Sequence, residues 1–371
     1  MRNHNSSQSE PTVGLVVPGF FVPPVNGGQK VCNDLCFGLA KRVKVVCFSP
    51  HPTAVNGNVE YIRALSSGWT GLIDLRVVFR LAKSLRANRI SSCIINQPFI
   101  FPLAFLACKL SGTRLFTYAH NLEFKRRTGL RRLFWPLVFC LEAVAFRLSH
   151  RVFFISPEEL SDSKKYFNLS CDKCIYLPHI ARSIKLGTGI KNPVDRPFTL
   201  IFFGNFSFAP NRHALEKLFQ FIVPRLANQL PFKCNLIIFG QNIPNTHQPG
   251  SLGSNFSWDI FGVVPDPTNL ITAADALINP VSFGAGVQTK IIESISLGTP
   301  VIAAKSGARG IDLSTTGSSL ICIDDRDWQG YLNAVISLQK SDSNQLVPPK
   351  EFLETYSEDA VISKALKALV S

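Results

Sequence analysis

The residues from Asn279 to Ala303 read N-P-V-S-F-G-A-G-V-Q-T-K-I-I-E-S-I-S-L-G-T-P-V-I-A. An apolar run leads into a glycine loop, an amphipathic segment follows, and Gly298 ends that segment shortly before a second apolar run. This order is typical of a strand, a crossover helix and a second parallel strand. A glycine loop that opens a helix presents free backbone N–H groups at the positive end of the helix dipole, where phosphate binds well.

Side chains within this segment predict a phosphate-binding site. Gly284 and Gly286 lack a Cβ and would let a ligand approach the backbone closely. Lys290 lies one turn into the expected helix and could reach the same anion, while Glu293 could accept hydrogen bonds from ribose hydroxyls. A nucleoside diphosphate would satisfy both groups. The alternative is an ordinary crossover in which the glycines only form turns and the two charged side chains are solvated.

The same alternation of short β-branched runs and longer amphipathic runs extends through the chain from Val13. It predicts the α/β class with two Rossmann-like domains, because 371 residues exceed the size at which one core usually stops growing. A polar, glycine-containing stretch at 182–196 separates the two halves. The expected divisions are a disordered tail at 1–11, an N-terminal domain at 12–185, a C-terminal domain at 186–350, and a terminal helix at 351–371 that crosses back to the first domain.

Apolar periodicity also places the individual elements. The expected strands are 13–18, 43–48, 59–64, 92–96, 115–120, 152–155 and 175–178 in the first half, then 199–203, 234–239, 258–263, 276–279, 301–304 and 321–323 in the second. The main expected helices are 72–87, 130–148, 210–230, 287–297, 328–338 and 358–370.

The composition narrows the class of protein. Hydrophobic residues at 46% and charged residues at 17% fit a globular protein, and the apolar stretches are interrupted before they reach membrane-spanning length. The tail at 1–11 has no apolar signal-peptide core. Most of the ten cysteines lie in apolar runs, as free thiols do, so a reducing cytoplasm is expected. Cys171 and Cys174 form a single C-x-x-C without the further ligands of a zinc site.

The formal net charge of +14 points to an anionic partner. The segment at 124–135, which overlaps the start of the expected helix 130–148, sets bulky apolar residues beside five cations, Lys125, Arg126, Arg127, Arg131 and Arg132. A basic amphipathic segment of this kind can lie on an anionic membrane surface, and the alternative is a solvated basic face. No nucleic-acid partner is expected, because no aromatic stacking pattern or nucleic-acid module accompanies the charge.

Further segments accompany the glycine loop in a characteristic order. Gly27 and Gly28 follow the first strand, and Y-A-H-N-L-E at 118–123 follows a central one. F-I-S-P-E-E stands at 154–159, F-G-N-F at 203–206, P-N-R-H-A-L at 210–215 and F-G-V-V-P-D at 261–266. Over roughly 13–338 this set resembles the glycosyl transferases group 1, retaining enzymes of the GT-B fold that bind a nucleotide sugar between two Rossmann-like domains.

The resemblance implies transfer of a sugar from a nucleotide-sugar donor to a hydroxyl acceptor, for example a lipid-linked or polysaccharide precursor. It implies His120 and Glu293 as catalytic residues. Donor and phosphate binding would fall to Gly27, Gly28, Gly204, Asn205, Arg212, Gly284, Ala285, Gly286, Val287 and Lys290. The nucleotide sugar would be a substrate, so no cofactor is expected. No metal is expected either, since the D-R-D at 325–327 lies where a helix cap is needed.

Two positions depart from the family pattern. Ala285 stands where the family commonly has a first acidic residue, and Asn205 follows Gly204 where a cation is usual. A non-catalytic scaffold of the same fold, a nucleotide-sugar epimerase and a basic RNA- or lipid-binding protein are therefore the alternatives. His120 has its own alternative as a satisfied core histidine, and the Gly27–Gly28 pair as a simple turn.

Overall fold

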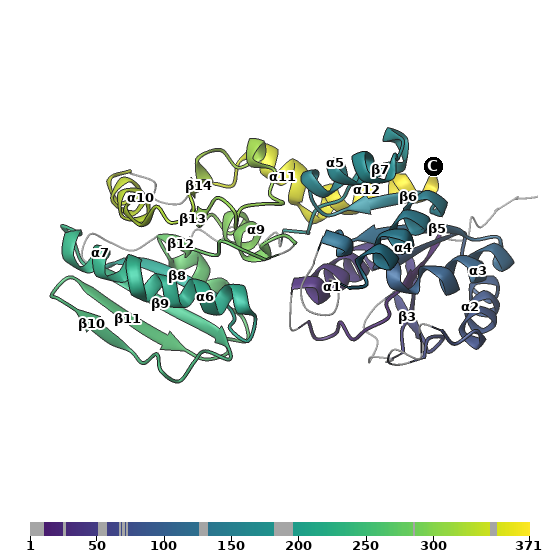
Figure 1. Cartoon of the computed structure of the whole chain (residues 1–371), viewed down its shortest axis with the longest axis horizontal. Coiled ribbons are helices and arrows are strands. Elements are labelled where there is room, and N and C mark those ends of the chain that lie inside the picture. Colours follow the sequence, from purple (N-terminus) through teal and green to yellow (C-terminus); the bar gives the residue numbers. More distant parts are fainter. Residues whose placement is uncertain are drawn as a thin grey trace, which may run out of the picture. The chain divides into compact units, whose positions relative to one another are not determined.

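The computed structural model describes residues 11–24, 27–50, 58–66, 68, 71, 73–125, 133–181, 196–284, 286–341 and 347–371. The chain divides into two compact units, unit 1 with Met1–Ile180 and Val361–Ser371, and unit 2 with Ala181–Ala360. Each unit has its own parallel sheet with helices packed on it (Figure 1). The predicted α/β class with two Rossmann-like domains is confirmed. Within the described residues, no helix combines the length and apolarity that crossing a bilayer requires.

Unit 1 contains a seven-stranded sheet in the order β3-β2-β1-β4-β5-β6-β7, and every neighbouring pair is parallel. The strands are β1 Thr12–Val16, β2 Lys44–Phe48, β3 Val59–Ile62, β4 Ser92–Asn96, β5 Arg114–Ala119, β6 Arg151–Phe154 and β7 Cys174–Tyr176. The strand order reverses direction at β1. In sheets of this type a crevice for ligands opens at the carboxyl ends of the strands beside such a reversal.

The helices of unit 1 fall into two groups. Residues of α2 Arg76–Ala87, α3 Phe101–Ser111, α4 Trp135–Leu148 and α5 Pro157–Phe167 share one core cluster with the strands, whereas α1 Gly27–Ala40 and α12 Glu358–Val370 contribute nothing to it. Helices α1 and α12 pack so closely together that a Cβ on Gly38 would lie 2.7 Å from Ile362. The 3₁₀ turns are η2 Pro98–Ile100, η3 Glu123–Lys125 and η5 Cys171–Lys173.

Unit 2 has a second seven-stranded sheet, in the order β10-β11-β9-β8-β12-β13-β14. The strands are β8 Phe198–Asn205, β9 Cys234–Gln241, β10 Gly250–Leu252, β11 Phe256–Phe261, β12 Ala276–Asn279, β13 Val301–Ala304 and β14 Leu320–Ile323. All pairs are parallel except β10 with β11. The sequence did not predict β10, because a three-residue edge strand without an apolar run has no periodic signal.

The helices of unit 2 are α6 Ala209–Lys217, α7 Val223–Gln229, α8 Thr268–Ala273, α9 Thr289–Ser296, α10 Trp328–Lys340 and α11 Lys350–Tyr356, with 3₁₀ turns η7 Leu313–Thr315 and η8 Gly317–Ser319. The helix predicted over 210–230 is interrupted by a π-helical segment, η6 Leu218–Ile222. Pro224 follows this segment, and its missing N–H removes a regular α-helical hydrogen bond there. Asp327 caps α10 by accepting the Gly330 N–H at 2.9 Å, so the predicted helix cap is confirmed.

The C-terminal segment is divided between the two units. The helical pattern expected at 358–370 forms α12 with those bounds, and the rest of the segment assigned to one terminal helix at 351–371 lies in a separate helix, α11, which ends before Ser357. Tyr356 at the end of α11 is fully buried in unit 2, and its carbonyl accepts the Ala181 N–H at 2.7 Å. Helix α12 belongs to unit 1 from Val361 onward, where Ser92 Oγ donates to the Leu369 carbonyl at 2.8 Å. The expected tail and linker fall largely on 1–10 and 182–195, outside the described residues.

Two glycines lie opposite each other at the carboxyl ends of β8 and β9. Gly204 pairs with Gly240 in the strand register, and both have positive φ, +154° and +139°. A Cβ on Gly240 would lie 1.9 Å from the Gly204 carbonyl oxygen, and a Cβ on Gly204 would lie 2.8 Å from the side chain of Asn211. Side chains at these two positions would therefore push apart the edge of the sheet at which β8 ends.

The Gly240→Ala substitution should lower the free energy of unfolding of unit 2 by at least about 2 kcal/mol, because it adds both backbone strain and a clash with backbone atoms. The matched control is Gly262→Ala, at a glycine that has no atom within 4 Å of its Cβ position and no positive φ. Urea denaturation of both variants gives the comparison. Equal unfolding midpoints for the two would contradict the close approach of β8 and β9.

Candidate active site

The first candidate site lies at the carboxyl edge of the unit 2 sheet. Strand order reverses between β8 and β12, and most of the predicted donor-binding residues lie between the end of one of these strands and the first turns of the helix that follows it. Asn205 ends β8, Arg212 is exposed on α6, and Gly284 lies in the loop after β12. Loops at the same edge of a parallel sheet lie close together. The fold therefore brings these sequence-distant residues to one place within unit 2.

A buried lysine joins these loops. Lys290 lies in the first turn of α9 and is only 7% exposed. Its Nζ donates to Asn211 Oδ1 at 2.9 Å, and Asn211 Nδ2 donates to the Asn205 carbonyl at 2.9 Å. Burial lowers the pKa of Lys290 to about 7, because the charged form loses its hydration. An anion bound beside this ammonium group would restore the protonated form.

The Asn205 side chain shapes the loop after β8. Its Oδ1 accepts hydrogen bonds from the backbone N–H and the hydroxyl of Ser207, at 3.0 and 2.7 Å. Its Nδ2 donates to Gln241 Oε1 at 3.1 Å. The amide group is thus occupied in holding the loop that leads into α6. At the position where the family usually has a cation, this chain has Asn205, whose amide group stabilises the loop. The buried cation of the site is instead Lys290 on α9.

The loop after β12 adopts a backbone that favours glycine. Gly284 has a φ of +129° and Gly286 a φ of +79°, and a Cβ on Gly284 would lie 3.3 Å from Pro210 Cγ at the start of α6. Ala285 is outside the described residues, and Val287 packs partly buried on the core of unit 2. Helix α9 begins without a capping side chain. Its first backbone N–H groups are therefore directed toward this loop without a side-chain acceptor.

Buried polar atoms beside α9 mark the same edge. Glu293 lies half-buried one turn after Lys290. Asn279 ends β12 and is fully buried, and neither its Oδ1 nor its Nδ2 has a hydrogen-bond partner among the described residues. A buried polar group without a partner costs about 1–3 kcal/mol. Such a group is expected where a ligand or a conformational change supplies the missing partner.

The second candidate site lies in unit 1, where His120 directly follows β5. The imidazole is 5% exposed, and its Nε2 lies 3.1 Å from Asn96 Oδ1 at the end of β4. Burial lowers the pKa of His120 to about 4, so the ring is neutral near pH 7. The Nδ1 of His120 and the Nδ2 of Asn96 both lack hydrogen-bond partners within the described part of the chain.

These two atoms are complementary in their hydrogen bonding. With Asn96 Oδ1 as the acceptor, Nε2 of His120 carries the hydrogen and Nδ1 is left as an acceptor. The amide Nδ2 of Asn96 is a donor. The pair therefore offers one acceptor and one donor, and a hydroxyl group can satisfy both at once.

Two carboxyl groups hold the turn that follows this histidine. Glu142 on α4 is fully buried and accepts the backbone N–H groups of Glu123 and Phe124 at 2.8 and 3.0 Å. Glu159 on α5 accepts the Leu122 N–H at 3.3 Å. Burial raises the pKa of Glu142 to about 7 and that of Glu159 to about 8. Three consecutive backbone donors are thus bound by carboxyl groups from two helices.

The predicted glycine pair of unit 1 begins a helix. Gly27 and Gly28 are the first two residues of α1, and both are exposed. They follow β1, which pairs with β4, so they lie at the sheet edge where Asn96 ends its strand. Residues 25 and 26 are outside the described residues.

Sequence reasoning missed four side chains at these sites, Asn96, Asn279, Glu142 and Asn211. Asn96 and Asn279 each end a strand that is otherwise mostly apolar, and Glu142 stands alone in an apolar helix. A single amide or acid at such a position is a usable signal, because it must find a polar partner or remain unsatisfied. Asn211 has no comparable signal, since its role depends on a contact with α9.

Comparison with known proteins assigns a family to each half of the chain. The model of the glycosyl transferases group 1 matches residues 197–341, and that of Glycosyltransferase Family 4 matches residues 25–179. No curated protein gives a significant match.

Solved structures similar to this chain include a sucrose-phosphate synthase from Thermosynechococcus elongatus, with a TM-score of 0.68 and 15% identity over 96% of this chain and 98% of that one. HepE from Anabaena in complex with UDP and glucose has a TM-score of 0.67 and 13% identity over 97% of this chain and 99% of that one. The lipopolysaccharide outer core galactosyltransferase WaaB has a TM-score of 0.66 and 13% identity over the same shares, 97% and 99%.

The two family models fall on different units, and together they cover both candidate sites and every strand of the two sheets except β1. The order of strands in each unit and the similar solved structures agree on the fold. The chain belongs to the glycosyl transferases group 1 and is a glycosyltransferase with the GT-B fold.

Proposed function

We propose that the protein transfers a sugar from a nucleotide sugar to a hydroxyl acceptor with retention of the anomeric configuration. The observation that carries the proposal is the buried ammonium group of Lys290, held by Asn211 beside a glycine loop and the start of α9. A diphosphate is the ligand that such a site fits best. The similar HepE structure contains UDP, which makes a UDP-sugar the first donor to test.

In this reaction the bond from the sugar C1 to the phosphate oxygen breaks, and a bond from C1 to the acceptor oxygen forms. The acceptor proton passes to the departing diphosphate. Negative charge on that group is stabilised by the N–H groups of the loop and of α9, by Lys290 and by the exposed Arg212. Glu293 is placed to accept from the ribose. These groups supply the positive charge that a metal ion supplies in other enzymes, so the proposal requires none.

The unit 1 site is proposed to bind the sugar. One hydroxyl would donate to His120 Nδ1 and accept from Asn96 Nδ2, which supplies the partners that both atoms lack in this structure. Both atoms are closed to solvent here, so binding requires the side chains around them to move apart. A neutral imidazole can orient the hydroxyl without repelling positive charge that develops at C1.

Peripheral contact with an anionic membrane through the segment at 125–132 remains a prediction. Arg126, Arg127, Arg131 and Arg132 are outside the described residues. The ammonium group of Lys125 pairs with Asp162 and lies 5.1 Å from the ring centroid of Tyr166.

The affinity for UDP should fall as pH rises from about 7 to about 9. A diphosphate binds the protonated form of Lys290, whose pKa is about 7 in the free protein, so above that pH binding must take up a proton. Uptake of one proton weakens affinity by up to about tenfold per pH unit. Isothermal titration calorimetry in buffers of different ionisation enthalpy measures both the affinity and the proton uptake.

The Lys290→Met variant should bind UDP more weakly and lose this pH dependence. Lys305→Met is the matched control, because Lys305 is an exposed lysine of the same unit that pairs with Asp324 at 3.2 Å. A wild-type affinity that is constant over this pH range would refute the assignment of Lys290 to the diphosphate.

The His120→Ala variant should lower kcat by about 10²-fold, the lower end of the usual range for a positioned catalytic side chain, with little change in the KM for the donor. The reason is that the imidazole contacts the reacting sugar, whereas the nucleotide is held by unit 2. Steady-state kinetics with a UDP-sugar gives both constants. His150→Ala, at an exposed histidine before β6, is the control and should be unchanged. Full activity in His120→Ala would return the residue to a core role.

The Glu142→Gln variant should lower kcat while leaving the donor KM nearly unchanged, because the amide NH₂ can no longer accept one of the two backbone N–H groups. Loss of a hydrogen bond to a charged group should also cost about 1.5–3 kcal/mol in the free energy of unfolding. Glu158→Gln, at the exposed neighbour in the first turn of α5, is the control. A variant that is less stable but retains the wild-type kcat would show that the hydrogen bonds to Glu142 serve only folding.

A further inference from the structure

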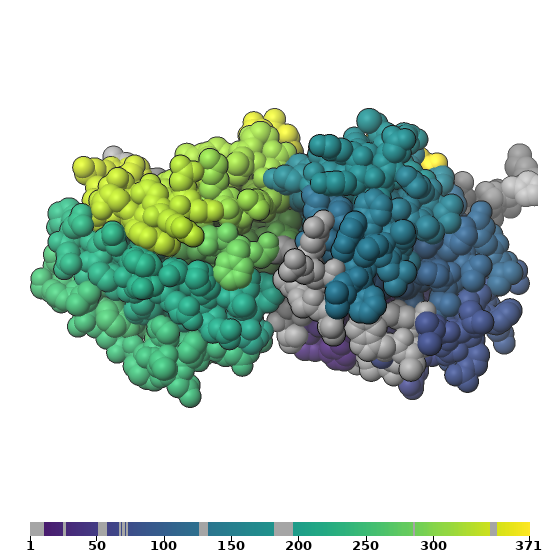
Figure 2. Space-filling view, in the orientation of Figure 1, coloured from purple at the N-terminus to yellow at the C-terminus, as the bar shows by residue number. Residues whose placement is uncertain are grey.

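The outer surface of helices α2 to α5 is unusually apolar. We call it the α2–α5 face and define it by its most exposed large apolar side chains, Phe79, Leu106, Leu133, Phe134, Leu137 and Leu148, which are 48–74% exposed. Figure 2 shows part of this helical layer, blue to teal, on the visible side of unit 1. A soluble surface seldom gathers this many large apolar groups on adjacent helices.

Helix α4 shows the pattern most clearly. Its inner side buries Ala143 and Phe146, while Leu137, Val144 and Leu148 follow each other at helical spacing on the outside and are 68%, 48% and 51% exposed. A helix that is apolar all round is expected to be buried on all sides. Here one side has no cover within the described part of the chain.

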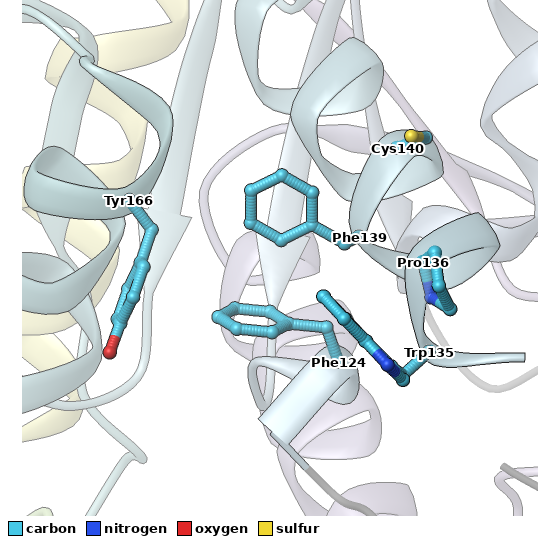
Figure 3. Close-up of a pocket in the computed structure, with 6 residues that line it drawn as sticks. All are labelled: Phe124, Trp135, Pro136, Phe139, Cys140 and Tyr166. Atoms are coloured by element: carbon cyan, nitrogen blue, oxygen red, sulfur yellow. The ribbon is translucent and has the colours of Figure 1, made fainter. Parts of the chain in front are cut away.

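An apolar pocket opens beside this exposed side. It has a volume of about 340 Å³ and is lined by Phe124, Trp135, Pro136, Phe139, Cys140 and Tyr166 (Figure 3). The volume is at the lower end of the range for ligand pockets, and the lining lacks the convergent polar groups that would orient a polar ligand. A single hydrocarbon chain matches both properties.

The charge on the same helices is strongly positive. Helices α2 to α5 contain eight Lys and Arg residues and four acidic ones, and the carboxyl groups of Glu142 and Glu159 bind the buried turn instead of facing outward. Asp162 pairs with Lys125, which leaves Glu158 as the other exposed acid of these helices. Exposed cations such as Lys83, Lys109 and Lys165 are thus interspersed with the apolar side chains.

Apolar side chains surrounded by cations fit the interface of an anionic bilayer, where the rings and leucines enter the acyl boundary and the cations meet the head groups. A second copy of this chain fits less well, because it would bring two basic faces together in a protein of net charge +14. We propose that the α2–α5 face docks on an anionic lipid bilayer, with the outer side of α4 inserted and one lipid chain in the pocket.

Vesicle flotation tests this docking without donor or acceptor, so a failed transferase assay does not affect the result. The full chain should bind vesicles of phosphatidylcholine mixed with phosphatidylglycerol and not vesicles of phosphatidylcholine alone. Binding should weaken as NaCl rises from about 0.1 M to about 1 M, which shortens the Debye length from about 10 Å to about 3 Å.

The double variant Phe79→Glu with Leu137→Glu should bind mixed vesicles at least about tenfold more weakly, a change of about 1.4 kcal/mol. The matched control is Val263→Glu, since this apolar residue of unit 2 is 64% exposed, close to the 69% and 68% of the two test positions. Brominated lipid chains should quench tryptophan fluorescence, and Trp135→Phe should remove most of that quenching.

Three outcomes would overturn the proposal. The first is that the protein does not bind the mixed vesicles. The second is that the double variant and the control lose binding equally. The third is that the protein sediments as a dimer and the double variant sediments as a monomer. The last outcome would assign the α2–α5 face to a second copy of the chain. Quenching that persists in Trp135→Phe would remove the pocket from the docking surface.

Discussion

The geometry of the candidate site in unit 2 depends on the burial of one ammonium group, that of Lys290, almost completely away from water. In the part of the chain that the structure describes, the hydrogen-bond partner of Lys290 Nζ is a neutral oxygen, Asn211 Oδ1, and Nζ lies 4.8 Å from the ring centroid of Phe202. Such a site is costly for a cation until an anion arrives. The missing Cβ of Gly204 leaves room for the lysine and Asn211, and the close approach of Gly240 keeps β9 against β8. At the edge where a diphosphate would bind, the protein thus holds a prepositioned amine whose protonated form an anion would stabilise.

Unit 1 uses neutral groups at the equivalent edge of its own sheet. His120 and Asn96 form one hydrogen bond with each other, and among the described residues the acceptor Nδ1 of His120 and the donor Nδ2 of Asn96 remain without partners. The turn behind them is held by Glu142 and Glu159, whose burial is stabilised by backbone N–H groups instead of by cations. A charged unit 2 site and a neutral unit 1 site suit the two parts of a nucleotide sugar, the diphosphate and the sugar ring.

The carboxyl groups of Glu142 and Glu159 also link the proposed sugar site with the outer surface of unit 1. Glu142 belongs to α4 and Glu159 to α5, and both helices carry the apolar and basic side chains of the α2–α5 face. Phe124, whose backbone N–H donates to the Glu142 carboxyl group, lines the apolar pocket together with Trp135. The same short segment therefore borders both the proposed site for the donor sugar and the pocket proposed to take a lipid chain.

Local patterns were enough to predict the α/β class, most strands and the glycine loop that leads into α9, because strand and helix periods and glycine turns are properties of neighbouring residues. Strands 92–96, 276–279 and 301–304 have the predicted bounds. Local patterns missed β10, the π-helical segment before Pro224 and the separate helix α11, because short elements are set by a single turn or by long-range contacts and give no periodic signal. The partners of Lys290 and His120, their shifted pKa values and the uncovered side of α4 depend on which distant segments pack together, so they are properties of tertiary packing alone.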